Sequence, residues 1–215
     1  MTLLGRFRAA LGRDEATLLA RARGDVRMGL GLNPPACLPP LNRAIAALER
    51  LPNSPEVALL LGRALRAKAE AEPGASARVL RARSVAKLRA VIESPRVSVA
   101  EKSALWAALA QAWLPLRDDV SDTELCYRQL LRASEAQTEA LVMPSASGHL
   151  VMAEIALALC QSPHCNDPQS MAQTALQHIS AASSFGPDKD ELATGKVLQG
   201  KLYHLFPGLA ARQKP

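Results

Sequence analysis

Residues 44–65 read AIAALERLPNSPEVALLLGRAL, and this stretch decides the fold class. Up to Leu51 the apolar residues recur three and four positions apart, the spacing of one helix face. Pro52 and Pro55 lack backbone donors, so the first helix must end there. Ser54 suits a helix N-cap, and a second helical pattern follows it. The stretch therefore predicts two helices joined by a short turn.

Composition supports an all-α protein. The chain has 215 residues, of which 48% are hydrophobic but only 3% aromatic. Its apolar content is mainly Ala, Leu and Val, and both Ala and Leu are strong helix formers. Aromatic and β-branched residues are too sparse for a convincing sheet. A chain of this length can also bury a substantial core.

Proline, glycine and asparagine clusters divide the chain into helical segments. Two starts carry a capping-box pattern, Ser98 with Glu101 and Ser121 with Glu124, and Ser54 caps a third. The predicted helices cover residues 3–12, 14–29, 41–51, 55–71, 76–93, 98–116, 121–141, 146–161, 168–183 and 188–205.

A repeat links three of these helices. Leu61-Gly62 in the first copy corresponds to Leu109-Ala110, which lies between Trp106 and Trp113, and more weakly to Met152-Ala153. The helix after each of the last two copies carries small and large residues at matching spacing, namely Cys126, Leu130 and Ala133, then Ala172, Leu176 and Ile179.

This pattern resembles the tetratricopeptide repeat, a family of stacked antiparallel helix pairs with a period of about 34 residues. The resemblance covers residues 40–205 and implies antiparallel α-α hairpins in a right-handed solenoid. Successive copies here lie about 45 residues apart, so we expect an irregular stack. An Ala/Leu-rich bundle is the alternative. We expect an N-terminal amphipathic segment and Pro-rich linker over 1–39, then a repeat domain over 40–215 that ends in a capping helix.

The resemblance also implies a function. Such proteins hold a partner segment in a concave groove, so we expect an adaptor or assembly scaffold that binds another protein. The Lys and Asn clamp of the family's carboxylate-binding members is absent, but two arginines could hold an acidic peptide. Alternatively, both are simply solvated. The matching groove positions are Leu59, Arg63, Arg66, Ala107, Gln111 and Leu114.

A second candidate surface is basic. Arg83 and Lys87 share a helix face, with no nearby acid until Glu93. The net charge of +6 favours acidic partners, while the lack of aromatic stacking residues makes nucleic acid an unexpected ligand. The surface could bind acidic protein, RNA or anionic lipid, or be the solvated side of a helix. Its residues are Arg78, Arg81, Arg83, Lys87 and Arg89. A structural subunit of a large complex and an RNA-binding repeat remain alternative functions.

Signatures of catalysis are missing. The sequence has no phosphate-binding glycine loop, H-E-x-x-H or G-x-S-x-G motif, so we expect neither enzymatic activity nor a cofactor. Cys160, His164 and Cys165 cluster, but their spacing is not that of a zinc site. We expect no metal there, but a free thiol or an occasional disulfide between Cys160 and Cys165.

The cellular location is predicted from the lack of a long apolar segment. No apolar run approaches the ~18 residues of a membrane span, so we expect a cytoplasmic protein with reduced thiols. Within residues 1–13, apolar Leu3, Leu4, Phe7 and Leu11 alternate with Arg6, Arg8 and Arg13. We expect a first packing helix there. A transit peptide to an organelle matrix and a membrane-surface anchor are the alternatives.

Overall fold

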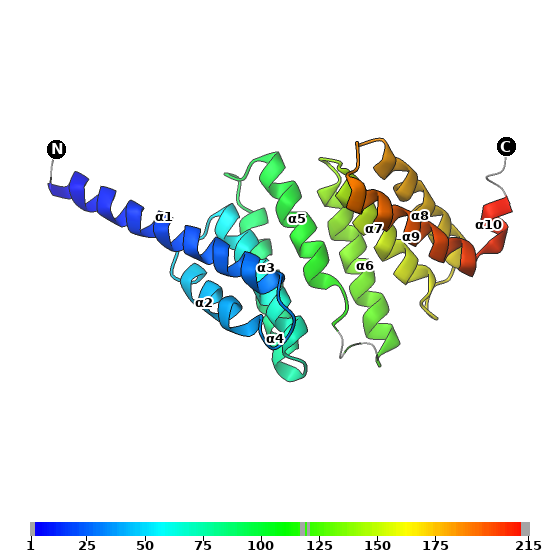
Figure 1. Cartoon of the computed structure of the whole chain (residues 1–215), viewed down its shortest axis with the longest axis horizontal. Helices are drawn as coiled ribbons and strands as arrows, with labels where there is room; N and C mark the ends of the chain where they lie inside the picture. Colours follow the sequence, from blue (N-terminus) through cyan, green and yellow to red (C-terminus); the bar gives the residue numbers. More distant parts are fainter. Residues whose placement is uncertain (1–2, 117–118, 120, 212–215) are drawn as a thin grey trace. The chain divides into compact units, whose positions relative to one another are not determined.

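The computed structural model describes the backbone of residues 3–116, 119 and 121–211, and the side chains between Asp14 and Leu209 with the same gaps. All regular secondary structure in this part of the chain is helical, which confirms the all-α prediction. The helices, drawn in Figure 1, are α1 (Leu3–Leu30), α2 (Leu38–Leu48), α3 (Pro55–Ala71), α4 (Ala75–Ile92), α5 (Val99–Trp113), α6 (Thr123–Ala140), α7 (Ala146–Cys160), α8 (Pro168–Ser183), α9 (Lys189–Leu205) and α10 (Pro207–Ala211).

Consecutive helices pack in pairs. α1 lies against α2, α3 against α4, α5 against α6 and α7 against α8. By its packing the chain divides into two compact units, residues 1–97 with α1 to α4 and residues 98–215 with α5 to α10. The sequence-based division at residue 39 falls inside the first unit, within the first turn of α2, which packs against α1. The two units are described separately below.

A close crossing of α3 and α4 organises the first unit. A Cβ atom on Gly62 would lie 3.0 Å from the side chain of Leu88, which is fully buried. Beside this contact, the buried Ser84 hydroxyl donates a hydrogen bond of 3.0 Å to the carbonyl oxygen of Gly62. The absence of a side chain at Gly62 therefore allows the two helices to approach closely.

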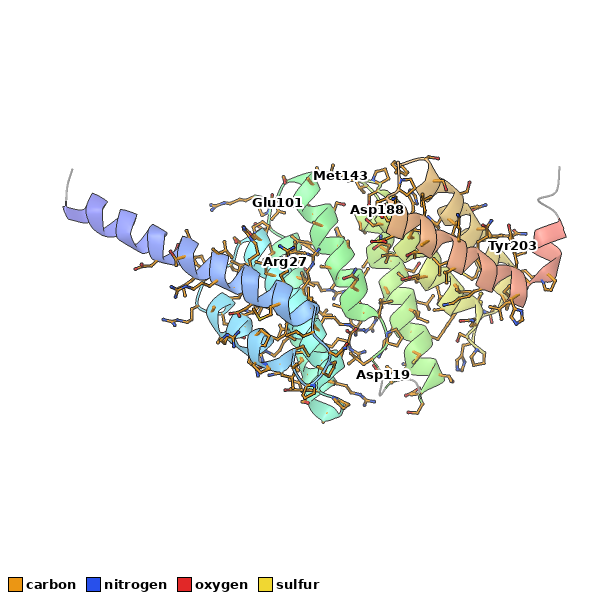
Figure 2. The ribbon with its side chains drawn as sticks, in the orientation of Figure 1. Arg27, Glu101, Asp119, Met143, Asp188 and Tyr203 are labelled. Atoms are coloured by element: carbon orange, nitrogen blue, oxygen red, sulfur yellow. The ribbon has the colours of Figure 1, made fainter. Side chains whose placement is uncertain are left out.

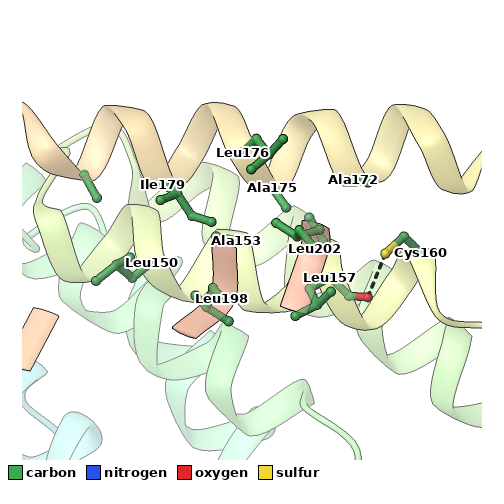
Figure 3. Packing of buried hydrophobic residues seen from close by; sticks show 12 residues of the cluster. Leu150, Ala153, Leu157, Cys160, Ala172, Ala175, Leu176, Ile179, Leu198 and Leu202 are labelled. Carbon is green, nitrogen blue, oxygen red and sulfur yellow. Dashed lines mark hydrogen bonds between the residues drawn. The ribbon is translucent and has the colours of Figure 1, made fainter. Parts of the chain in front are cut away.

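The second unit has its main core where α7, α8 and α9 meet (Figure 3). α9 packs against both α7 and α8, and its Leu198 and Leu202 enter their core. Small residues of α8 face larger ones of α7, so the two helices pack closely. The drawn core includes Leu150, Ala153, Leu157, Ala172, Ala175, Leu176 and Ile179.

The repeated sequence pairs are buried on the first helix of three hairpins. Leu61-Gly62 on α3, Leu109-Ala110 on α5 and Met152-Ala153 on α7 are all buried. In each pair the second residue is Gly or Ala, the smallest side chains available. The repeat thus corresponds to a common packing role on the first helix of three successive hairpins.

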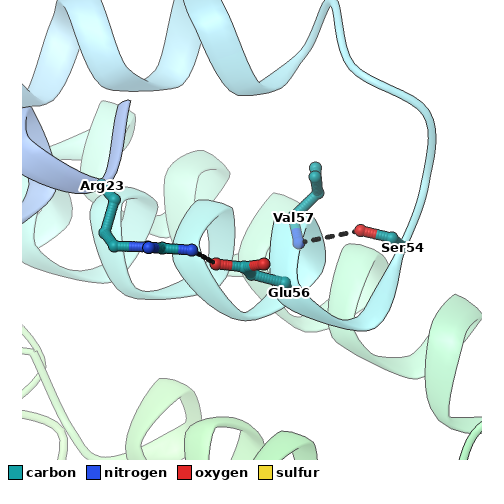
Figure 4. Close-up of polar contacts among 4 residues, drawn as sticks. All are labelled: Arg23, Ser54, Glu56 and Val57. Atoms are coloured by element: carbon teal, nitrogen blue, oxygen red, sulfur yellow. Dashed lines mark hydrogen bonds and ion pairs between the residues drawn. The ribbon is translucent and has the colours of Figure 1, made fainter. Parts of the chain in front are cut away.

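Two of the three predicted helix caps are confirmed. The Ser54 hydroxyl accepts a hydrogen bond from the backbone of Val57, and in the same view Arg23 of α1 donates to Glu56 (Figure 4). Ser98 and Glu101 form the predicted reciprocal box, with Ser98 N 2.9 Å from a Glu101 carboxylate oxygen.

The prediction that Ser121 caps the next helix was wrong. Asp122 holds that position, and its carboxylate accepts a 2.9 Å hydrogen bond from the backbone N–H of Leu125. Asp and Ser are comparable as caps, but an Asp also places negative charge at the positive end of the helix dipole.

Two helix boundaries also differ from the prediction. Segments 3–12 and 14–29 form one helix, α1, because Gly12 weakens a helix without removing a donor. Pro39 and Pro40 lie in the first turn of α2 instead of preceding it. Backbone N–H groups of a first turn have no partner inside the helix, so prolines there break no hydrogen bond.

Candidate functional site

The predicted groove residues of the first unit share one side of α3. Leu59 is half-buried and Arg63 is exposed, without an ion-pair partner among the described residues. Arg66 differs, because its side chain is only 13% exposed and its guanidinium lies 2.7 Å from the Glu70 carboxylate one turn later. Of the two arginines expected to hold an acidic peptide, Arg63 is therefore the more available.

The remaining groove residues belong to the second unit. Gln111 is exposed and Ala107 half-buried on α5. Leu114, just after α5, packs against the buried cluster that includes Leu130 and Ile155. Leu114 therefore contributes to a core. The predicted groove residues thus divide between the two units, three on α3 and the others on α5 and its end.

Most of the predicted basic surface lies on the outer side of α4. Arg78, Lys87 and Arg89 are exposed, and neither Lys87 nor Arg89 has an ion-pair partner in the described part of the chain. Figure 2 shows the side chains of this region. This helix carries no Asp or Glu between Ala75 and Ile92. Its charge is therefore entirely positive.

Two members of the predicted surface need correction. Arg81 is only 8% exposed, because its spacing places it on the side of α4 that also carries buried Ala77 and Ser84. Arg83 is not distant from acids, since its guanidinium donates to the carboxylate of Glu49, which follows α2. Sequence neighbours alone could not reveal this acid, which lies 34 positions away.

A row of small apolar residues runs between the cations of α4. Val79 is 60% exposed, and Ala82, Ala86 and Ala90 are exposed with it at helical spacing. By the same spacing, the cations lie on both edges of the row, Arg78 and Arg89 along one and Arg83 and Lys87 along the other. The outer face of α4, as defined by these eight residues, is an apolar strip with basic borders.

Cys160 and His164 of the predicted cysteine and histidine cluster form hydrogen bonds within the protein. The Cys160 thiol is buried and donates to the carbonyl oxygen of Leu157 at 3.0 Å. Burial, and then the neighbouring Cys165, raise the pKa of Cys160 to about 11, so it stays protonated at neutral pH. His164 Nε2 lies 3.0 Å from the hydroxyl of Thr123. Within the described residues, no group of three or more His, Cys, Asp or Glu side chains is placed to hold a metal.

A buried carboxylate was missed by the sequence analysis. Two adjacent acids, Asp118 and Asp119, follow α5 in the sequence; the first lies outside the described residues, and the second is fully buried. Asp119 accepts hydrogen bonds from the backbone of Leu116 at 3.2 Å and from the side chain of Gln129 at 3.1 Å. It is labelled in Figure 2. These bonds join the segment after α5 to α6, so the role of Asp119 is structural.

Two histidines that are far apart in the sequence also meet. His149 of α7 and His178 of α8 lie with their Nδ1 atoms 2.9 Å apart. The signal in the sequence was their position at nearly equal distances on either side of the turn between the predicted helices 146–161 and 168–183. In an antiparallel hairpin such positions face one another.

One cavity lies along the outer side of α8. It has a volume of about 550 Å³ and is lined by side chains of α8 together with Leu209 of α10. Its lining contains no charged or titratable side chain, so it offers no group for acid–base chemistry. The other lining residues are Gln173, Leu176, Gln177, Ser180, Ala181 and Ser184.

The side chains of the N-terminal amphipathic pattern, residues 1–13, lie outside the described residues. Its three interpretations stay predictions. Among the described helices, none combines the length and the apolar character that crossing a membrane requires. Comparison with protein families, curated proteins and solved structures found no match to this chain.

Proposed function

We propose that this chain is a non-catalytic scaffold of tetratricopeptide-like hairpins that binds an acidic helical segment of another protein. The observation that carries the proposal is the outer face of α4, where an exposed apolar strip has cations on both edges. The burial of the three repeated pairs supports the repeat architecture.

The chemistry of this face favours an amphipathic helix as the ligand. Val79 to Ala90 spans about 16 Å along the helix axis, or three turns. Alanine side chains allow a partner helix to approach at the short end of the usual 8–10 Å interaxial range. A helix with an apolar stripe and Glu or Asp on both sides would then place carboxylates opposite the two basic edges.

Lys87 and Arg89 have no ion-pair partner in the described part of the chain, whereas Arg83 pairs with Glu49. Arg83 and Lys87 are one turn apart, a like-charge spacing that destabilises a helix by about 0.2–0.5 kcal/mol. Only Arg89 lies in the last turn, where the helix dipole favours positive charge. An acidic partner would offset the positive charge of Lys87 and Arg89, which supports assigning the cluster to binding.

The groove predicted on α3 is a second possible location for the same function. Its exposed Arg63 is the one cation there that no described acid engages. The apolar area beside it is smaller than on α4, because Leu59 is half-buried and the adjoining Arg66 is held by Glu70. We therefore place the binding surface on α4, and the experiment below separates the two.

The test uses a labelled amphipathic peptide about as long as α4, with Ala and Leu on one face and Glu on both flanks, and a matched peptide with Lys in place of Glu. Binding is measured by fluorescence anisotropy at about 50 mM and about 300 mM salt, because exposed charges are strongly screened at the higher value. The variants are Lys87→Glu/Arg89→Glu on α4, Arg63→Glu on α3, and Lys196→Glu/Lys201→Glu on α9 as a control with the same charge change.

We expect only the acidic peptide to bind, with affinity that falls as salt rises. The α4 variant should weaken binding by about tenfold or more, equivalent to about 1.4 kcal/mol, while the α9 variant leaves it within twofold. Loss with Arg63→Glu alone would move the site to α3. Equal loss with the α4 and α9 variants would reduce the effect to net charge and refute the proposal. The same variants then test any partner recovered from cells.

A further inference from the structure

Two imidazoles meet head-on between α7 and α8. The Nδ1 atoms of His149 and His178 are 2.9 Å apart, and their ring centres are 5.2 Å apart. The difference between these distances is about the sum of two centre-to-nitrogen radii. Each Nδ1 therefore points directly at the other, with the ring planes tilted by 33°. This is the geometry of a hydrogen bond between nitrogens and not of two ligands converging on a third atom.

The geometry fixes the number of protons between the rings. A neutral imidazole has one N–H donor and one acceptor nitrogen, whereas an imidazolium has two donors. One Nδ1 must therefore carry a proton and the other must present its lone pair. If both rings are charged, two N–H groups face each other at hydrogen-bond distance, and the contact becomes repulsive.

The surroundings offer little to stabilise a positive charge. α8 contains no Asp, Glu, Lys or Arg, and the one carboxylate of α7, Glu154, is exposed. On α6, Glu135 and Glu139 are exposed. At the start of α9, Asp188 and Glu191 hold each other's backbone N–H groups in a capping box, with Lys189 and Asp190 exposed between them.

An aromatic ring closes one side of the pair. Phe185, just after α8, stacks on His149 with ring centres 5.2 Å apart and planes 24° apart. Burial lowers the pKa of His149. The pKa of His178 is also lowered, first by burial and then by the positive charge that His149 acquires on protonation. Both effects oppose charging of the rings, and therefore oppose the doubly charged pair, in which no proton can be shared.

We infer that His149 and His178 form a pH-sensitive link, which holds the start of α7 to α8 through one shared proton and is lost when both rings become charged. Because folding lowers both pKa values, the unfolded chain binds protons more readily than the folded one. The stabilising effect is therefore present at neutral pH. It is lost as the pH falls below 6.5, the ordinary histidine value, through the lower values of the folded state.

This device lies outside the proposed binding face, since α4 belongs to the first unit and the histidine pair to the second. It would make the α7–α8 hairpin, together with Phe185 and the cavity along α8, responsive to acidification. The described residues of the first unit contain no histidine, so this response should be confined to the second unit.

The test is a histidine titration by NMR on the full chain, following the ring nitrogens of all four histidines from about pH 8 to pH 4.5. We expect two coupled steps for His149 and His178, separated by about one pH unit or more and both below 6.5, the ordinary histidine value. Loss of the hydrogen-bonded Nδ1 signal should accompany the second step, at which both rings are charged. Two independent titrations at the ordinary histidine value would overturn the inference.

A second measurement follows hydrogen exchange of residues 146–152 and 176–185, corrected for intrinsic pH dependence. In the wild type, protection should fall by about tenfold between pH 7.5 and pH 5 relative to helices of the first unit. The His149→Gln/His178→Gln variant, which cannot titrate there, should lose this pH dependence, and His204→Gln should retain it. If the double variant and the wild type respond alike to pH, the histidine pair is not a pH-sensitive link.

Discussion

The α3–α4 and α7–α8 hairpins pack alike but present different chemistry to the outside. At their centres, small residues allow close contact: Gly62 with Ser84 in one, Ala153 with Ala172 and Ala175 in the other. Their second helices differ entirely in charge, because α4 carries only basic charged residues and α8 carries none. The inner face therefore fixes the hairpin, while the outer face is free to acquire a separate function.

The polar links inside the two hairpins differ as well. Ser84 and the carbonyl of Gly62 form a link that no change between pH 4 and pH 8 can break, because neither group titrates there. His149 and His178 form one that is disrupted when both rings become charged. The polar link of the first hairpin is therefore insensitive to acid, whereas that of the second is not.

The largest change in stability is expected from a side chain placed at the close crossing of α3 and α4. We expect Gly62→Leu to destabilise the first unit by roughly 1–3 kcal/mol, because even a Cβ there meets Leu88 at 3.0 Å. Gly200→Leu on α9, which has nothing within 4 Å, should instead stabilise its helix by about 0.5–1 kcal/mol.

Urea unfolding can assign these changes to a unit. Far-ultraviolet circular dichroism reports all helices, whereas tryptophan fluorescence reports the second unit, because Trp106 and Trp113 are the chain's two tryptophans. Gly62→Leu should move the dichroism transition more than the fluorescence transition. Equal movement of both, or no loss with Gly62→Leu, would contradict the importance of the close crossing.

A smaller effect is expected from the buried hydroxyl. Ser84→Ala removes the hydrogen bond to Gly62 while leaving the apolar contacts intact, so we expect a loss of about 1 kcal/mol. Exposed Ser180 on α8 is the control, and Ser180→Ala should change the unfolding free energy by less than about 0.5 kcal/mol. Equal effects of the two substitutions would show that the link in α3–α4 contributes nothing specific.

The smallest effect concerns the charge that distinguishes α4. Arg83→Gln removes an ion pair with Glu49 in which both side chains are partly exposed, 46% and 38%. We expect a loss of about 0.2–1 kcal/mol that fades in about 1 M salt. Denaturation at low and high salt measures it. A loss that persists in high salt would mean that Arg83 acts through its packing and not through its charge.

Local signals predicted much of the fold. Ser54 and the Ser98–Glu101 pair marked helix starts correctly, because capping depends on residues within one turn. Asp122 was passed over for Ser121, since two good caps stood side by side. Pro39 and Pro40 were taken as breakers because their effect depends on which turn of the helix they occupy.

The binding surfaces were harder to predict, because they depend on residues distant in sequence. The α4 cations could be identified in the sequence as basic residues of one predicted helix. The burial of Arg81 and the pairing of Arg83 with Glu49 could not, because both depend on how α4 packs against its neighbours. The histidine contact needed the antiparallel register of α7 and α8. The groove on α3 and α5, and the family resemblance, stay predictions.

The pairing of each helix with its neighbours in the chain has a consequence for how quickly the protein reaches its native state. The contact between Arg83 and Glu49 spans 34 residues and the one between Ser84 and Gly62 spans 22. Short loops close at little entropic expense, and proteins dominated by such contacts fold in microseconds to milliseconds. Synthesis adds only about 5–20 residues each second. The first unit should therefore finish folding on the ribosome, before the polypeptide that forms α5 to α10 has emerged.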